Sequence, residues 1–386
     1  MEINSNFCES TSHRKAKVET VFIYEPVNDW SYSHHQSITF FKGKFYAIWS
    51  NGRRNEDDPE QRVLISSSEN FYSWTDPTPL VDSKQGEHSS LVLTAAGFHQ
   101  NEDTLVAYLG KYEYEFDYLK RNQVQKDGYL SIKMPKPTDR RTRGCMGHMG
   151  TELWAISKKR QESWGNLENL NLPIVPNHGP QKTHSGRLII SGNISYPYTD
   201  ERSGLADWAM SGIYPSNMDP VYDDAEAFWV VKEMRGWDVG LCEGSFYQTE
   251  DNVIHMLLRS LTSYLWVTES SDDGITWSDP KPTKFTDNNT KFHFGSLPDG
   301  RVYYVGCPDP EGSRIPLVIS VSKDGRNFDR HLILGSDEYV SKREGRAKGG
   351  QYGYPHTLVH DGYIYIIISR CKEAVQVIRI SLSELE

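Results

Sequence analysis

One short pattern recurs along this chain and limits what the chain can fold into. Its full copy is SSDDGITW at residues 270–277, in which polar turn residues precede a tryptophan at fixed offsets. Degenerate copies follow strand-like runs at three other places: SSENFYSW (67–74), SKKRQESW (157–164) and SKDGRNF (322–328). Asp and Ser side chains bond turn backbone and glycine takes positive φ, so the pattern predicts a β-hairpin corner. Corners repeated every few tens of residues are typical of propellers and solenoids.

The chain also divides into units of a strand, a polar or glycine turn, and a more apolar strand. Six units are recognisable, and the last has only about three strands before the chain ends. The segment KVETVFIYEP near the N-terminus can supply its missing strand and remove the sheet edges. The sequence therefore predicts an all-β fold, a single β-propeller of four-stranded blades over residues 17–386, preceded by a flexible tail at 1–16. The stretch 110–150 is either a large insertion or part of a further blade.

Composition excludes several classes of protein. The net charge of −10 argues against a nucleic-acid partner, which would require a basic face. The five cysteines are scattered without a CxxC pair, so neither a disulfide framework nor a zinc–thiolate cluster is expected. No run of apolar residues is long enough to span a membrane, and the polar N-terminal residues predict no signal peptide in this sequence. Secreted and cytoplasmic locations both stay open. We expect a monomer without a cofactor, although a structural metal ion at the propeller axis is compatible with the histidines described next.

Titratable residues stand at or just before the expected innermost strand of every unit. They are His35, His88, His184, Glu243, His293 and His356, and His34 stands directly beside the first of them. The innermost strands of a propeller lie beside its axis, so these side chains are expected to converge on one funnel. Crowded titratable groups with little solvent are where pKa values move toward catalytic use. The alternative for each histidine is a hydrogen bond to a neighbouring blade.

Arginines and aromatic residues complete the expected site. Arg259 ends an apolar strand of the fourth unit, where its planar guanidinium would suit a substrate carboxylate. Arg54 follows the second strand of the first unit, and the remaining candidates are Arg53, Arg187, Arg235, Arg314, Arg346 and Arg370. The aromatic residues for stacking on a sugar include Tyr112, Tyr352 and Tyr354.

Two family resemblances follow from these motifs. The full corner matches the Asp-box, S-x-D-x-G-x-T-W, so the chain resembles the sialidase-like β-propellers. Those enzymes are similar to one another in an early Arg-Ile-Pro motif, an arginine triad and a Tyr/Glu nucleophile pair. Here Arg-Ile-Pro occurs only late, at 314–316, and the early position reads YSHHQSI, which argues against hydrolysis of sialic acid.

The second resemblance is closer. The runs WSYSHHQSITFFKGKFYAIWSNG and GGQYGYPHTLVHDGYIYIIIS are similar to the propeller enzymes that act on L-rhamnose-α-1,4-D-glucuronate, described as α-L-rhamnosidases and as lyases. This resemblance implies seven blades, against the six counted from the sequence. It also implies a catalytic histidine, which would fall on the pair His34 and His35.

The resemblance to these enzymes implies removal of terminal L-rhamnose from an α-1,4-linked glucuronate by β-elimination. Arg259 would neutralise the carboxylate, His35 with His88 would remove the C5 proton, and Tyr354 would protonate the departing oxygen. The substrate-binding residues would be His34, His184, Glu243, His293, His356, Tyr112, Tyr352 and Arg54. Two alternatives stay open. One is a glycoside hydrolase centred on Glu243, either a rhamnosidase or a divergent exo-sialidase, and the other is a non-catalytic propeller that binds glycan.

Overall fold

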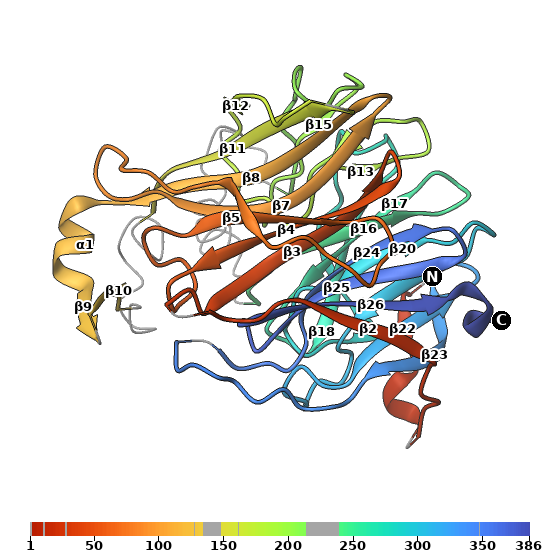
Figure 1. Ribbon diagram of the computed structural model, residues 1–386. Coiled ribbons are helices and arrows are strands. Elements are labelled where there is room, and N and C mark those ends of the chain that lie inside the picture. Colours follow the sequence, from red (N-terminus) through yellow and green to blue (C-terminus); the bar gives the residue numbers. More distant parts are fainter. Residues whose placement is uncertain are drawn as a thin grey trace.

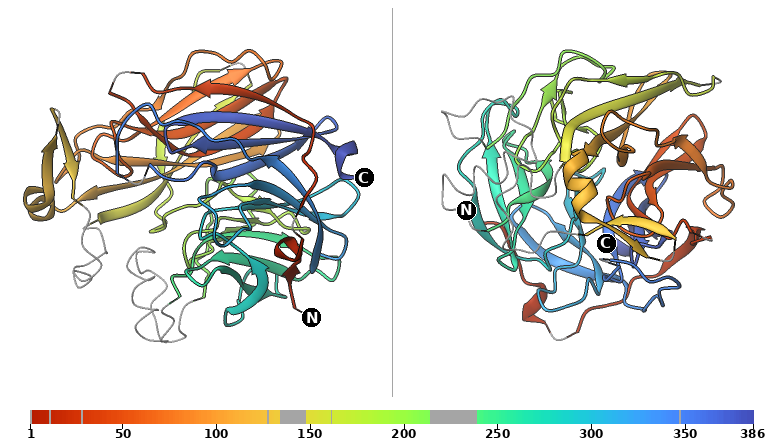
Figure 2. Two further views of the ribbon diagram at one scale, coloured as in Figure 1. Left: turned by 90° about the horizontal axis from the view of Figure 1, so that it is seen from below. Right: turned by 90° about the vertical axis from the view of Figure 1, so that its left-hand side faces the viewer.

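The computed structural model describes residues 2–10, 12–27, 29–126, 128–133, 148–160, 162–213, 239–346 and 348–386. Within these residues the strands form six antiparallel blades around a central axis, as the views in Figures 1 and 2 show. Five blades have four strands and the third blade has three. The fourth and fifth blades are joined through their outer strands into one nine-stranded sheet. The prediction of an all-β propeller is confirmed.

The strands follow one another along the chain, blade by blade. Blade one contains β3 (Tyr32–Phe41), β4 (Lys44–Gly52), β5 (Arg62–Ser68) and β6 (Thr78–Val81). Blade two contains β7 (Val92–Asn101), β8 (Thr104–Tyr114), β11 (His148–Lys159) and β12 (Leu167–Asn169). Blade three contains β13 (Gln181–Lys182), β14 (Leu188–Ile189) and β15 (Tyr198–Thr199). Blade four contains β16 (Cys242–Gln248), β17 (Ile254–Arg259), β18 (Tyr264–Ser270) and β19 (Lys281–Thr286). Blade five contains β20 (His293–Ser296), β21 (Val302–Gly306), β22 (Leu317–Ser322) and β23 (Asn327–Gly335). Blade six contains β24 (Gly353–His360), β25 (Tyr363–Arg370), β26 (Ala374–Ser381) and β2 (Val18–Tyr24).

Apolar side chains fill the contact between each blade and the next. Ile319 and Ile366 belong to the cluster between blades five and six, and Trp49 and Ile367 belong to the one between blades six and one. Similar clusters lie between the other four pairs of neighbours, so the ring is closed by burial of apolar surface. As predicted, β2 supplies the fourth strand of the last blade by pairing antiparallel with β26.

The repeated corners connect the third and fourth strands of blades one, two, four and five. In the full copy, Asp272 Oδ1 accepts a hydrogen bond from the Thr276 amide at 2.9 Å, and Gly274 has φ of +86°. Phe71 holds the position of Gly274 in the first copy, with φ of +69°. The Trp277 indole donates to Ser211 Oγ at 2.8 Å, and therefore ties its corner to the preceding blade. The corners stabilise the rim of the propeller, away from the axis.

Part of the segment 1–16, for which a flexible tail was expected, packs on the propeller. β1 (Asn4–Ser5) inserts between β19 and β23, and pairs with both in parallel. Ile3 is 2% exposed within the cluster between blades four and five, and η1 (Phe7–Glu9) follows it. The segment packs there because it covers two outer strand edges and buries apolar side chains. The many polar residues around Ile3 and Phe7 gave no sign of this.

The long insertion belongs to blade two. Between β8 and β11 the chain forms α1 (Phe116–Asn122) and a hairpin of β9 (Gln123–Lys126) and β10 (Tyr129–Ile132), which project at the left of Figure 1. Residues 134–147 lie outside the described part of the chain. The described residues contain no seventh blade, so the six units counted from the sequence match them and the count of seven does not. η2 (Leu382–Leu385) ends the chain, and none of the described helices has the length and apolarity to cross a membrane.

Candidate functional site

Three inner strands begin with the same local distortion. The pairing register shifts between His34 and Ser37 in β3, between Cys242 and Ser245 in β16, and between Gly353 and His356 in β24. The second residue of each bulge has positive φ: +53° for His35, +52° for Glu243 and +53° for Tyr354. Non-glycine residues avoid this region at a cost of about 1–3 kcal/mol each, and such outliers cluster at functional sites. The shared bulge therefore makes these three side chains candidates for a functional set.

Tyr354, Glu243 and Arg259 contact one another directly. The Tyr354 hydroxyl donates to Glu243 Oε1 at 2.5 Å, and Arg259 Nη1 lies 2.5 Å from Glu243 Oε2. Arg259 Nη1 also donates to the Tyr354 hydroxyl at 2.9 Å, while its Nε donates to Asn289 Oδ1 at 2.7 Å. Blades four and six thus supply one hydrogen-bonded group of a phenol, a carboxylate and a guanidinium.

The protonation states in this group follow from burial and charge. Burial alone would raise the pKa of Glu243, but Arg259, Lys291 and the hydrogen bonds outweigh it, so the pKa is lowered. Burial and then the neighbouring Glu243 carboxylate raise the pKa of Tyr354 well above its usual value. The resting pair is therefore a neutral phenol that donates to a carboxylate anion.

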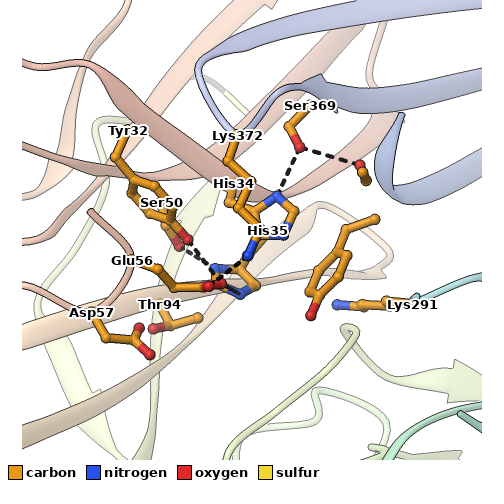
Figure 3. A network of polar contacts seen from close by, with 12 residues as sticks. Tyr32, His34, His35, Ser50, Glu56, Asp57, Thr94, Lys291, Ser369 and Lys372 are labelled. Carbon is orange, nitrogen blue, oxygen red and sulfur yellow. Dashed lines mark hydrogen bonds and ion pairs between the residues drawn. The ribbon is translucent and has the colours of Figure 1, made fainter. Parts of the chain in front are cut away.

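A second polar group lies on blade one, where Figure 3 shows His35, Ser50 and Glu56 together. His35 Nε2 lies 3.6 Å from Glu56 Oε1, and its Nδ1 shares a hydrogen bond of 3.2 Å with Ser50 Oγ. Lys372 Nζ donates to Glu56 Oε2 at 2.5 Å. The edge of the His35 ring lies against Tyr354, with ring centroids 5.5 Å apart. The two groups therefore form one site.

Burial sets unequal pKa values in the blade-one group. It lowers the pKa of His35 to about 4, so the imidazole is neutral at physiological pH. Burial would raise the pKa of Glu56, but Lys372 and His35 together lower it to about 2. Burial and the adjacent Glu56 charge raise the pKa of Asp57 to about 7. When two neighbouring carboxyl groups have very different pKa values, one can serve as a proton donor while the other stays an anion. Here Asp57 would be the donor and Glu56 the anion.

Cations surround the ring of Tyr354. Lys291 Nζ, Arg314 Cζ and Lys372 Nζ lie 5.4, 5.5 and 5.9 Å from its centroid. Arg314 Nη1 is buried and has no hydrogen-bond partner among the residues that the structure describes. A buried N–H without a partner is costly, because desolvation is not compensated. Together with Arg259, Arg314 provides a surface that suits a carboxylate.

Deeper on the axis lies a cluster of His178, His293 and His356. One nitrogen from each of these residues lies within 4.8 Å of those of the others, so this is one of two groups of described residues that could hold a metal ion, and His34, His35 and Glu56 form the other. Two features oppose this. His356 Nδ1 accepts the Ile38 amide at 3.3 Å, which puts the ring proton on Nε2, and the neighbouring Lys291 ammonium would repel a cation. Burial first, and then charged neighbours that include Lys291, lower the pKa values of all three imidazoles. The cluster is better suited to neutral, hydrogen-bonded imidazoles than to a cation.

The predicted residues divide into those the structure brings together and those it does not. His35, Glu243, Arg259 and Tyr354 lie in the site, and His34 packs on Tyr354 with ring centroids 4.0 Å apart. His293 and His356 lie in the axial cluster, linked to the site by Lys291. Tyr112 is buried close enough to Asp57 for their charges to interact.

Four predicted residues lie elsewhere in the fold. His88 is in the loop before β7, where its amide donates to Glu113 Oε2 at 2.9 Å. His184 is at the turn between β13 and β14, beside Asn252. Tyr352 packs between blades five and six and donates to Asp337 at 2.6 Å. Arg54 lines a neighbouring cavity. The candidate Arg235 falls outside the described residues.

Sequence reasoning missed five residues, which are Glu56, Asp57, Lys291, Lys372 and His178. The acidic run NEDD after β4 was the available signal for the first two, because it directly follows an inner hairpin. Lys291 stands two residues before His293, and Lys372 follows the end of β25.

Comparisons with known proteins agree with the fold. The chain matches the family model described as BNR repeat-like domain over residues 43–366. A protein of unknown function from Dyadobacter fermentans is 15% identical, with TM-score 0.60, and the match covers 94% of this chain and 99% of that one. The sialidase of Trypanosoma rangeli is 13% identical, with TM-score 0.62, over 95% of this chain and 60% of that one. The intramolecular trans-sialidase of Ruminococcus gnavus is 13% identical, with TM-score 0.60, over 95% and 97%. A search of curated proteins finds no match.

The blades with Asp-box corners define a propeller of the BNR/Asp-box superfamily. The family model matches well over half of the chain, which therefore belongs to the BNR repeat-like domain family.

Proposed function

We propose that this protein is a glycoside hydrolase that acts on a terminal sugar carrying a carboxylate, with Tyr354 as the nucleophile. The observation that carries the proposal is the 2.5 Å hydrogen bond from the Tyr354 hydroxyl to Glu243, in a site that also holds Arg259. A tyrosine nucleophile is the known exception to the use of two carboxylates in glycoside hydrolysis. The structural neighbours that are sialidases, one of them in complex with sialic acid, support the choice of an acidic sugar.

The reaction can be written with the residues in hand. Tyr354 Oη bonds to the anomeric carbon while its proton passes to Glu243, the glycosidic C–O bond breaks, and Asp57 protonates the leaving oxygen. Water then attacks the anomeric carbon and gives its proton to Asp57, the C–Oη bond breaks, and Glu243 returns the proton to Tyr354. Both carboxyl groups and the phenol end in their starting states.

The substrate carboxylate is assigned to Arg259 and Arg314. The buried Nη1 of Arg314 lacks a partner within the described part of the chain, and a carboxylate oxygen would satisfy it. His35 stands on the inner strand where the resemblance to sialidases would put an arginine. The pocket therefore has fewer fixed cations there, and we leave open whether the sugar is a uronate or a sialic acid.

A β-elimination lyase on rhamnosyl-glucuronate is the second candidate. It is favoured by His35, a neutral imidazole oriented by Glu56 and Ser50 beside Tyr354, which could remove a C5 proton. In this case Tyr354 would protonate the departing oxygen and the arginines would neutralise the uronate.

One experiment separates the two candidates. Protein is incubated with an α-linked sialoside and, separately, with rhamnosyl-glucuronate oligosaccharides, while sugar release and the ultraviolet absorbance of unsaturated uronate are followed. Release without new absorbance is expected, and release with it would select the lyase. Under the lyase, His35→Ala would abolish turnover, whereas under the hydrolase it would weaken turnover about tenfold by removing a neighbour of Glu56. No release from any acidic glycoside would reject both candidates.

The pH profile gives a second test. If Asp57 is the general acid, kcat should fall about tenfold per pH unit above its pKa of about 7, because the proton it donates is then missing. The rate should also fall in acid as Glu243 takes up a proton, and only at a pH below the ordinary range of a glutamate, because its pKa is lowered. Asp57→Asn should remove the fall above pH 7 and lower kcat by about 10²- to 10⁴-fold on a poor leaving group, but less on a nitrophenyl glycoside. Glu60→Gln, at an exposed carboxylate nearby, is the matched control and should leave the profile unchanged. A profile that stays flat through pH 7 to 8 would remove Asp57 from this role.

A further inference from the structure

A cavity of about 880 Å³ adjoins the site and differs from it in charge. Its walls come from the insertion hairpin β9–β10 with Lys133, from residues 341–346 and 348 before the last blade, and from Arg54 and Asn55. Seven of the lining residues are cationic and one is acidic, in a chain whose net charge is −10. The cationic residues are Arg54, Lys126, Lys133, Lys342, Arg343, Arg346 and Lys348. Such a local excess attracts anions despite the overall charge.

Part of this charge is not neutralised by protein carboxylates. Lys348 pairs with the buried Glu373 at 3.3 Å, Lys126 pairs with Glu344 at 3.4 Å, and Lys342 pairs with Glu25 at 2.6 Å. Among the described residues, no carboxylate forms an ion pair with Lys133 or Arg343, both of which are exposed.

The cavity and the catalytic site share a wall. Arg346 Nη2 donates to the Glu56 carbonyl at 3.0 Å, and the Arg346 amide donates to Asn55 Oδ1 at 2.5 Å. The carboxylate of the same Glu56 binds Lys372 and faces His35. A saccharide that extends from the catalytic site past residues 54–56 would therefore enter the basic cavity.

The cavity also has an apolar platform. Tyr129 lies in its wall, with the Arg54 guanidinium 5.6 Å from the centre of its ring. Val124 adds an apolar side chain that is 42% exposed. An aromatic ring among cations can contact the apolar face of a sugar while the cations bind its acidic groups.

We infer that this cavity is a binding subsite for an acidic saccharide chain, whose uronate carboxylates are held by Lys133, Arg343 and the other cations of its wall. The inference rests on the proposed function, because it takes the saccharide in this cavity to be the part of the substrate beyond the cleaved bond. It narrows the substrate class from a terminal acidic sugar to an oligosaccharide with carboxylates along its length.

The test is direct binding of a galacturonate hexasaccharide to the full-length protein, measured by titration calorimetry at low and physiological salt. The double variant K133A/R343A is expected to raise Kd about 5- to 30-fold, and the effect should shrink at higher salt. The control K15A/K323A removes two exposed cations outside the cavity, changes the net charge equally, and should leave Kd unchanged. A glucose hexasaccharide without carboxylates should not bind.

Several outcomes would overturn the inference. They are no binding of the galacturonate by the wild type, equal Kd for wild type and K133A/R343A, an equal loss in K15A/K323A, and binding of a sulfated oligosaccharide but not of the galacturonate. Turnover of a single-sugar glycoside is measured in parallel and should be the same in wild type and K133A/R343A. If no glycoside is turned over but the binding result holds, the proposed function fails and the subsite stands.

Discussion

Replacing Tyr354 with phenylalanine is expected to lower kcat by at least about 10³-fold on any acidic glycoside that the wild type cleaves. The change removes the attacking oxygen but keeps the ring, and therefore its packing on His34. Glu243 keeps its 2.5 Å ion pair with Arg259, so the buried carboxylate stays compensated and the loss of stability should be about 1 kcal/mol. The measurements are kcat and the free energy of unfolding in urea.

Tyr352→Phe is the matched control for this experiment. Tyr352 lies two residues away and is equally buried, but its hydroxyl donates to Asp337 between blades five and six. Removal of that hydroxyl should cost similar stability and change kcat less than about twofold. Mass spectrometry of the wild type with a slowly hydrolysed fluoro-sugar should find the sugar attached to Tyr354. A fully active Tyr354→Phe enzyme, or a sugar attached elsewhere, would contradict the nucleophile assignment.

Much of the fold could be predicted because its corners depend on local chemistry. Asp272 and Gly274 form the turn through their own side-chain oxygen and backbone freedom, so the sequence alone reports the corner. Closure of the ring by β2 could also be predicted, because the last unit of the sequence lacked one strand. The burial of Ile3 was not, since the outer strand edges it covers are more than 270 residues away in the sequence.

The site residues could be predicted in the blades whose first strand begins with a bulge. In blade three, which has no such bulge, the prediction chose the wrong histidine. His35, Glu243 and Tyr354 share that bulge. Blade three has strands of only two residues, so the turn at His184 resembled a strand start while the axial residue was His178.

The residues after strand ends were harder to predict than the blade openings. Glu56 and Asp57 lie in a charged run that looks solvated, and Lys372 is brought to Glu56 across the join between the first and last blades. Lys372 and Glu56 become neighbours only when the ring of blades closes. Residues so far apart in the sequence give no local signal of this contact.

Arg314→Ala should raise KM for a carboxylate-bearing substrate by about 10- to 150-fold with little change in kcat, because a charged hydrogen bond contributes about 1.5–3 kcal/mol. Among the described residues the buried Nη1 of Arg314 has no hydrogen-bond partner, so its removal breaks no hydrogen bond at that atom. Arg259→Ala should raise KM and also lower kcat, because Arg259 holds both Glu243 and Tyr354. The measurement is a full set of KM and kcat values for both variants.

The controls decide whether charge is the cause. On a substrate whose carboxylate is reduced to an alcohol, wild type and Arg314→Ala should have the same KM, since the lost interaction has no counterpart. Arg301→Ala removes an arginine that pairs with Asp299 in the turn between β20 and β21, and it should behave as wild type. Equal KM values for wild type and Arg314→Ala on the acidic substrate would contradict the assignment. In that case the carboxylate would have to be bound by Arg259 with Lys291 or Lys372, the other cations beside Tyr354.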